Sequence, residues 1–388
     1  MLRLVHTADV HLGARHADMG DQAAALRERQ HKAFATAVDL ALAEKVDAFL
    51  VAGDLFDSNT QPRRTVERAA AELARLVAGH VRVALIPGTH DVYDRASVYR
   101  AYDLASMAGA PAGSDRLVVL TPERPEVTWA ALDLTVHGRV FATKRAPVDP
   151  LAGLDVSADK RTTWHVALVH GSVRVTGKTE HDEVVVAPDA IAASGLDYLA
   201  FGHWHSVQRG RAGATVWAYP GAPEPVALDQ AGAGNVLLVG LEERDGRRQV
   251  TLEERRVGRT RMERLSLDTA EVASQPALVG RLAAMGDPDL VLDVRLTGLR
   301  PEALDLVAEE VERELAARFF RLRVRDASVA ALPEGPLPPP DTIAGALARD
   351  LENRVAEAEA AGDPDAAAEL REALRLGRLL LDGREVTL

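Results

Sequence analysis

Cysteine is absent from the 388 residues of this chain. This absence excludes disulfide frameworks and thiolate metal sites, so a transition-metal site would have to use histidine and carboxylate ligands. The sequence also lacks any run of about 18 apolar residues, the length a membrane-spanning helix needs. Its beginning, MLRLVHTADVHLG, has no basic region followed by a long apolar stretch and a cleavage site. We therefore expect a cytoplasmic protein without a membrane span.

Acidic residues outnumber basic ones, and the formal net charge is −12. This value argues against a uniformly basic nucleic-acid binder. It leaves room for a local basic groove, and bound metal ions would add positive charge that a residue count misses. The apolar fraction of 47% predicts a globular chain with a sizeable core.

The first part of the chain alternates short apolar strands with amphipathic helices. This alternation predicts a largely parallel sheet with helices covering it. The expected strands are Leu2–Thr7, Val46–Ala52 and Val81–Ile86, and the expected helices are Asp21–Lys45 and Pro62–Ala78.

After about residue 115 the pattern is rich in strands, which predicts a core of two packed mixed sheets flanked by helices. The charged segment Gln249–Arg264 reads as a long hairpin arm that leaves this core. We place the end of the first domain, residues 1–262, within this segment.

The remaining residues predict two smaller parts. Residues 263–330 read as a small α+β domain with strands and helices in alternation, including a helix at Pro301–Ala317. The proline-rich stretch 331–340 predicts an extended linker. Residues 341–388 predict two amphipathic helices, the first capped by Asp341 and Thr342.

Five predicted strands are followed at once by histidine or aspartate. Because ligands in open α/β sheets bind at the carboxyl ends of strands, these side chains should converge. The five groups are Asp9 and His11, Asp54 and Asp57, His90 and Asp91, His170 alone, and His203 with His205.

Each group alone has an ordinary structural explanation. Asp54 after Gly53 would serve as a turn residue, and His170 before Gly171 would most often be structural. Together, two aspartates and four histidines exceed the needs of one ion and favour Mn²⁺, Fe or Zn²⁺ over Mg²⁺ or Ca²⁺. Two ions bridged by one carboxylate, about 3.5–4 Å apart, fit this set and suit phosphoryl chemistry.

The ordered motifs D-x-H, G-D-x-x-D, G-x-H-D, H-G and G-H-x-H resemble the calcineurin-like metallophosphoesterase superfamily. The strings HTADVHLG, VAGDLFDSN, FGHWH and YPGAPEP resemble the SbcD-type (Mre-eleven-type) DNA repair nucleases. This similarity covers about residues 1–245. It implies an α/β fold, a four-layer αββα sandwich with a small α+β capping domain and a C-terminal helical tail.

The resemblance also implies a role for each motif residue. One ion would be held by Asp9, His11 and His205, the other by His170 and His203, with Asp54 as the bridge. His90 would lie beside the scissile phosphate without binding metal, and Asp91 would orient it through a hydrogen bond. Asp57 would support the ligands or cap a loop.

One position departs from the family pattern. Thr89 stands in Gly88-Thr89-His90-Asp91, where the family has asparagine. The family asparagine supplies a carbonyl oxygen to the second ion, and threonine offers only a shorter hydroxyl. We expect Thr89 to bind the second ion through its hydroxyl or a water, with reduced affinity for that ion.

The function implied is a two-metal DNA exonuclease and endonuclease, most often Mn²⁺-dependent, acting in double-strand break repair. The alternatives are a phosphatase or phosphodiesterase for small substrates, and a non-catalytic scaffold for DNA or an ATPase. The implied partners are DNA, an SMC-like (SbcC-type) ATPase bound by residues 341–388, and a second copy of the chain. Alternatively, the C-terminal helices would pack back on the capping domain.

Overall fold

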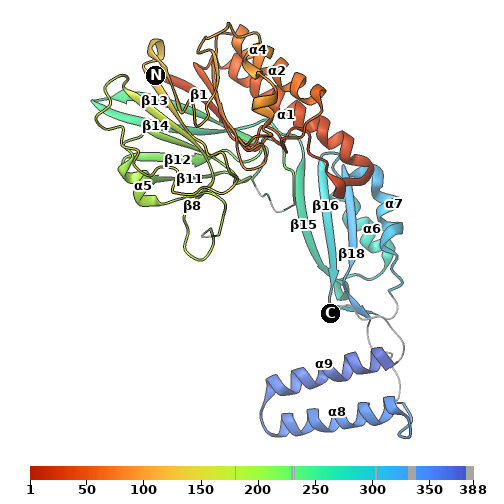
Figure 1. Cartoon of the computed structure of the whole chain (residues 1–388). Coiled ribbons are helices and arrows are strands. Elements are labelled where there is room, and N and C mark those ends of the chain that lie inside the picture. The colour runs from red at the N-terminus through yellow and green to blue at the C-terminus, as the bar shows by residue number, and fades with distance from the viewer. Residues whose placement is uncertain (180, 229, 231, 302–303, 331–337, 382–388) are drawn as a thin grey trace. The chain divides into compact units, whose positions relative to one another are not determined.

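The computed structural model describes residues 1–388 except 180, 229, 231, 302–303, 331–337 and 382–388. The chain divides into two compact units, Met1–Met262 and Glu263–Leu388 (Figure 1). Within the described residues, no helix has both the length and the apolar character needed to cross a bilayer.

The first unit contains two mixed six-stranded sheets, as the sequence predicts. The first sheet has the order β14-β13-β1-β2-β3-β4, with β1 to β4 parallel and β13 antiparallel to β1. Its strands are β1 (Leu2–Thr7), β2 (Ala48–Ala52), β3 (Arg82–Ile86), β4 (Leu117–Val119), β13 (Asn235–Arg244) and β14 (Arg247–Arg256).

The second sheet has the order β11-β12-β10-β7-β6-β5, in which β12, β10, β7 and β6 are parallel and the two edge strands are antiparallel. Its strands are β5 (Glu126–Trp129), β6 (Leu134–Arg139), β7 (Trp164–His170), β10 (Tyr198–Gly202), β11 (Gln208–Ala212) and β12 (Thr215–Tyr219).

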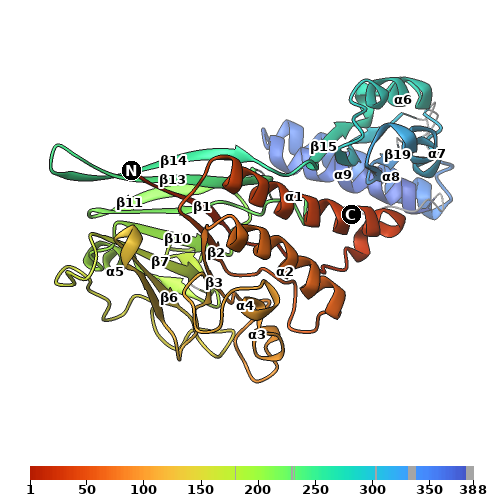
Figure 2. The ribbon, with the colours of Figure 1, turned by 90° about the horizontal axis from the view of Figure 1, so that it is seen from above.

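Side-chain alternation along the strands builds the layers. In β1, Val5 packs into the core beneath the helices, whereas Leu4 packs into the core between the two sheets. All five residues of β2 are buried, as expected for a strand covered on both faces. The helices α1 (Ala23–Ala43) and α2 (Arg63–Ala78) cover the first sheet (Figure 2).

In the described residues, the outer face of the second sheet is covered by a single short helix and a smaller core. The short helix α5 (Pro188–Ala193) supplies Ile191 to a core with Ala167 and Val169 of β7. The layers are therefore helices, sheet, sheet and helix. Shorter elements complete the unit: α3 (Val98–Ala101), α4 (Leu104–Met107), β8 (Ser172–Val173) and β9 (Val185–Val186).

The predicted hairpin arm at Gln249–Arg264 is wrong. The first half of this segment belongs to β14, which pairs along its whole length with β13 from Arg244↔Arg247 to Asn235↔Arg256. It forms the edge of the first sheet because its half-buried residues, Val250 and Leu252, pack against the core between the sheets. The other side chains of β14 are mostly charged and exposed, so nothing in the sequence indicated that this segment is an edge strand.

The second unit contains a three-stranded sheet in the order β15-β16-β18 and two short helices. Its elements are β15 (Arg261–Asp268), α6 (Gln275–Ala283), β16 (Leu290–Thr297), β17 (Leu299–Arg300), α7 (Ala308–Leu315), β18 (Arg321–Asp326) and β19 (Val329–Ala330). The helix expected at Pro301–Ala317 is shorter, because α7 begins at Ala308 and residues 302–303 lie outside the described residues.

Two long helices, α8 (Ile343–Ala360) and α9 (Pro364–Leu381), end the described chain. The predicted cap is confirmed at Thr342, whose side chain accepts a hydrogen bond from the Gly345 amide at 3.0 Å. Most of the predicted proline-rich linker, residues 331–337, lies outside the described residues.

Candidate metal centre

Six predicted ligand residues lie at the carboxyl ends of four parallel strands, two from each sheet. The two sheets approach closely at this end, because a Cβ on Gly202 would lie only 2.1 Å from the Ala52 carbonyl oxygen. Asp9 and His11 follow β1, Asp54 follows β2, His170 ends β7, and His203 and His205 follow β10.

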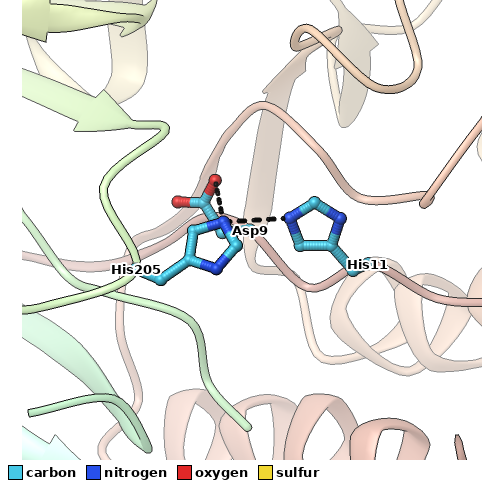
Figure 3. Close-up of side chains that lie close together, drawn as sticks. All are labelled: Asp9, His11 and His205. Carbon is cyan, nitrogen blue, oxygen red and sulfur yellow. Dashed lines mark hydrogen bonds and ion pairs between the residues drawn. The ribbon is translucent and has the colours of Figure 1, made fainter. Parts of the chain in front are cut away.

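Asp9, His11 and His205 form one group of possible metal ligands (Figure 3). The Nε2 atoms of His11 and His205 are 3.2 Å apart. His205 Nε2 is also 3.7 Å from Asp9 Oδ1. Two imidazole nitrogens and a carboxylate oxygen thus face one small space, as a cation site requires.

Asp54 joins this group to a second one formed with Asp9 and His170. Its Oδ2 atom is 3.1 Å from His170 Nε2 and 3.8 Å from His11 Nε2. All three side chains are buried. This is the position that a bridging carboxylate would occupy between two ions.

The hydrogen bonding of His170 fits a cation. Its Nδ1 lies 2.9 Å from the Ala52 carbonyl oxygen, which only accepts, so Nδ1 carries the proton. In a neutral ring Nε2 then presents a lone pair to Asp54 at 3.1 Å. Two acceptors this close repel each other unless a proton or a metal ion lies between them, so these residues fit a divalent cation.

Four of these residues have left-handed backbone conformations, which non-glycine residues seldom adopt. The φ angles are 53° at Asp9, 50° at His11, 51° at Asp54 and 101° at His203. These angles occur directly after β1, β2 and β10, where the chain leaves the sheet. Such strain persists only where the surrounding structure holds it in place.

Gly88 allows the loop after β3 to approach Asp54 closely. A Cβ at this position would lie 2.2 Å from Asp54 Oδ1 and 2.6 Å from the Asp54 amide nitrogen. The neighbouring His90 amide donates to Asp54 Oδ1 at 2.8 Å. The loop after β3 therefore packs its backbone directly against the Asp54 carboxylate.

His90 is exposed and its ring lies against that of His11, with 4.7 Å between the ring centroids. Its Nδ1 is 3.1 Å from the Asp57 carbonyl oxygen, which fixes Nδ1 as the donor. Nε2 is then the atom left for a substrate. This position agrees with a role beside a reacting phosphate.

The hydrogen bond expected from Asp91 to His90 is wrong for the described residues. The Asp91 carboxylate instead accepts from the amides of Gly88 and Phe56 and from the Tyr99 hydroxyl. Burial and the nearby charge of Asp54 raise the pKa of Asp91 to about 6. Asp91 thus holds the loop after β3 in shape, and His90 is oriented by the Asp57 backbone.

Thr89 and His203 lie close to the second group without joining it. Thr89 is buried, with its Oγ1 atom 3.5 Å from His170 Nε2. The His203 ring centroid is 5.4 Å from that of His170, and the His203 amide donates to both carboxylate oxygens of Asp9 at 3.0 Å. Among the described residues, His203 belongs to no group of three His, Asp or Glu side chains that could hold an ion.

Two further contacts support the histidines, one from Asp57, for which the family resemblance implies such a role or a loop cap, and one from Gln230. Asp57 Oδ1 lies 3.3 Å from His11 Nδ1, and the Gln230 side-chain amide contacts His205 Nδ1. Each contact reaches the ring nitrogen away from the centre and so orients the histidine. The spacing of Asp57 after Asp54 hinted at the first contact, whereas no motif marks Gln230.

Trp204 lies between His203 and His205 in the sequence, and its side chain makes its hydrogen bond outside the metal centre. Its Nε1 donates to Ser172 Oγ at 2.8 Å, and Ser172 in turn donates to Asp182. The indole is 37% exposed although its N–H is fixed.

Charge and burial oppose each other in the centre. Burial acts to lower the pKa of His170, but the charge of Asp54 outweighs it and raises the pKa to about 10. Asp54 shows the reciprocal effect: burial acts to raise its pKa, but His170 and His11 lower it strongly. Burial lowers the pKa of His203 and of His205, which keeps these rings neutral and able to bind metal.

His6, also at a strand end, belongs to the core. Its Nδ1 lies 2.8 Å from the Tyr198 hydroxyl and its Nε2 lies 3.1 Å from the Phe201 carbonyl oxygen. Burial lowers its pKa to about 3, so it stays neutral. It links the two sheets and does not reach the metal centre through these bonds.

A model of the family described as calcineurin-like phosphoesterase matches residues 2–207. Similar proteins include two named DNA double-strand break repair protein Mre11. The one from Aeropyrum pernix is 27% identical over 62% of this chain and 58% of its own length. The one from Methanopyrus kandleri is 26% identical over 87% of this chain and 74% of its own length.

A relative from Rhodobacter capsulatus, the SbcD component of the SbcCD nuclease, is 27% identical over 60% of this chain and 64% of its own length. The matched part of the chain thus spans 58%, 74% and 64% of the length of these three relatives. The family match covers the strands whose ends form the first group of possible ligands. The chain belongs to the calcineurin-like phosphoesterase family, and its similar relatives support the Mre11/SbcD type within that family.

Proposed function

We propose that this chain is a metal-dependent phosphodiesterase that cleaves DNA as an exonuclease, with endonuclease activity on single strands, in double-strand break repair. The observation that carries the proposal is the shared space formed by Asp9, His11, Asp54, His170 and His205. The names of the relatives, Mre11 and SbcD, supply the DNA substrate.

Two divalent cations, with Mn²⁺ as the proposed metal, would polarise phosphate oxygens and lower the pKa of water. Asp9, His11 and His205 would hold one cation, His170 with His203 and Thr89 the other, and Asp54 would lie between them. Asp57, Gln230 and the Ala52 carbonyl would orient the histidine ligands, and the burial of the ligands would exclude bulk water.

His90 is the proposed acid. Because its Nδ1 faces the Asp57 carbonyl, a protonated ring presents Nε2–H outward, where it would donate to the leaving oxygen. Its exposure allows direct contact with a phosphodiester. Asp91 acts indirectly: its carboxylate accepts a hydrogen bond from the Gly88 amide and so holds the loop that carries His90.

The test is digestion of end-labelled double-stranded and single-stranded DNA with Mn²⁺, beside a generic phosphodiester reporter. We expect DNA to be degraded, and His90→Ala to lower the rate by about 10²–10⁴-fold. His80→Ala is the matched control, because exposed His80 lies before the opposite end of β3. Hydrolysis of the reporter without DNA cleavage would instead indicate a phosphoesterase for small substrates.

The proposed protein partner is an SMC-like ATPase bound by α8 and α9. These helices expose apolar side chains, with Ile343 80%, Leu380 61% and Leu381 46% exposed. An apolar surface of this kind is suited to a partner helix.

A further inference from the structure

Trp204 is the one exposed aromatic side chain among the described residues. The phenylalanines, the tyrosines and the other tryptophans are all buried or half-buried. Apolar side chains exposed singly are normal on a protein surface. This one, however, stands between two proposed metal ligands, His203 and His205, so its place and not its exposure alone points to a ligand.

A hydrogen-bond network holds the indole in place. Trp204 Nε1 donates to Ser172 Oγ at 2.8 Å, and the Ser172 hydroxyl donates to Asp182. Ser172 is itself buried, and its amide donates to the Val184 carbonyl oxygen at 2.8 Å. Because Nε1 is the only polar atom of the indole and is already bonded, the exposed part of the ring is carbon. A ring fixed in this way is a pre-organised flat apolar surface, which loses little freedom when a ligand binds.

Trp204 and His90 border the same metal centre from different elements. The exposed ring of His90 lies against that of His11, with 4.7 Å between the centroids. Trp204 is held by Ser172, which follows two residues after His170. A substrate with its phosphate at the centre beside His90 would therefore have an aromatic surface next to the group attached to that phosphate.

The local charge suits a strand of nucleic acid. The turn that follows β8 carries Arg174 and Lys178, which are exposed and have no carboxylate partner in the described part of the chain. The nearby carboxylates are engaged, since Asp182 is bonded within the network and Glu183 pairs with Lys144 at 3.5 Å. An aromatic face combined with cations for the phosphates is the arrangement by which proteins hold single strands.

We propose that Trp204 stacks on an unpaired nucleobase next to the scissile phosphate, and so makes binding depend on a base at that position. The inference rests on the proposed function, which supplies the DNA strand. Every base has an aromatic face, so the contact depends on the presence of a base more than on its identity. A paired base is already stacked on its neighbours in the duplex, so the contact favours single strands and frayed ends.

The test is filter binding of end-labelled oligonucleotides to the full chain with Mn²⁺, in a His90→Ala background that slows cleavage. The probes are a short oligothymidylate and an abasic oligonucleotide of the same length, which keeps every phosphate and has no base. We expect the oligothymidylate to bind about tenfold more tightly, the usual size of one stacking contact. Equal binding of the two probes overturns the proposal.

Two substitutions at Trp204 isolate the aromatic ring, because both lose the bond to Ser172. Trp204→Phe keeps a flat aromatic face and should keep oligothymidylate binding within about threefold, whereas Trp204→Leu keeps apolar bulk alone and should weaken it about tenfold. Neither should change binding of the abasic probe. Equal losses in the two variants overturn the proposal. So does a loss in Trp204→Leu that is the same for both probes, because damage to the neighbouring ligands would act on both alike.

Cleavage of DNA by the wild type separates this inference from the proposed function. If the wild type cleaves DNA and the two probes bind equally, the stacking alone is overturned. If the wild type neither cleaves nor binds DNA, the proposed function is overturned and the stacking with it.

Discussion

At the scale of single residues, the centre should exchange a proton for a metal ion. His170 has a pKa of about 10 because Asp54 outweighs the effect of burial, so the metal-free ring is protonated at neutral pH. A cation between His170 and Asp54 must displace this proton. The same atoms therefore hold either a proton or a metal.

This exchange predicts proton release on metal binding. Between pH 7 and pH 9 we expect about one proton released from His170, and an affinity that rises up to about tenfold per pH unit. The sign follows because a higher pH removes the competing proton. Calorimetry in buffers of different ionisation enthalpy measures the release, and a value of zero contradicts the prediction.

Thr89 predicts weak binding of the second ion. Its hydroxyl is 3.5 Å from His170 Nε2, so the longer asparagine side chain of the relatives' motif should place an oxygen closer to the ion. We expect Thr89→Asn to tighten binding of the second Mn²⁺ by roughly 10-fold, in the range of effects seen around metal ligands. Titration of Mn²⁺ into both forms measures the change, and equal affinities reject the idea.

The sequence allowed the ligand types to be predicted, because histidine and aspartate stand directly after apolar strands. It did not allow the contacts to be predicted. Asp91 bonds to Gly88, Phe56 and Tyr99 because the loop after β3 turns back on itself. The contact with Phe56 joins residues 35 positions apart in the sequence, and no local pattern announced it.

At the scale of elements, the loops must pass within touching distance of the ligands. Gly88→Ala should therefore displace Asp54, since the new Cβ would lie 2.2 Å from Oδ1. We expect metal affinity to fall roughly 10–100-fold. Metal titration with a thermal melt separates lost binding from lost folding.

The matched control is Gly280→Ala in α6, where an added Cβ would meet nothing within 4 Å among the described residues. Alanine favours the helix by up to about 1 kcal/mol, so this variant should keep metal binding and gain slight stability. Similar losses in both variants would show that the effect is not due to contact with Asp54.

The strands β1, β2 and β3 of the first sheet, with the helices between them, were predictable because these three strands are mostly apolar and almost entirely buried. The edge strand β14 was not predicted, because only Val250 and Leu252 pack against the core and the rest of the strand is polar or charged. Long-range pairing with β13 outweighs its polar composition. Edge strands of this kind carry little local signal.

At the scale of the whole molecule, the metal centre belongs to one compact unit. All the proposed ligands lie within Met1–Met262. A fragment of residues 1–340, lacking α8 and α9, should therefore stay folded, bind Mn²⁺ and keep its activity on short DNA, while losing the ATPase partner. Circular dichroism, metal titration and co-purification measure these properties.

An insoluble fragment would indicate that α8 and α9 pack on the rest of the chain, as in the alternative derived from the sequence. A soluble fragment that still binds the ATPase would place the interface elsewhere. Exposed Ile343 offers a finer control, because Ile343→Ser removes apolar surface without removing a helix.

The position of Trp204 gives this protein an intrinsic optical probe. Trp129 and Trp164 are buried in the core between the sheets, whereas Trp204 is partly open to solvent and lies between His203 and His205. Its emission should change when cations or a nucleic-acid strand reach these neighbours. Loading of the centre can therefore be followed in the unlabelled chain, with Trp204→Phe showing which part of the signal originates there.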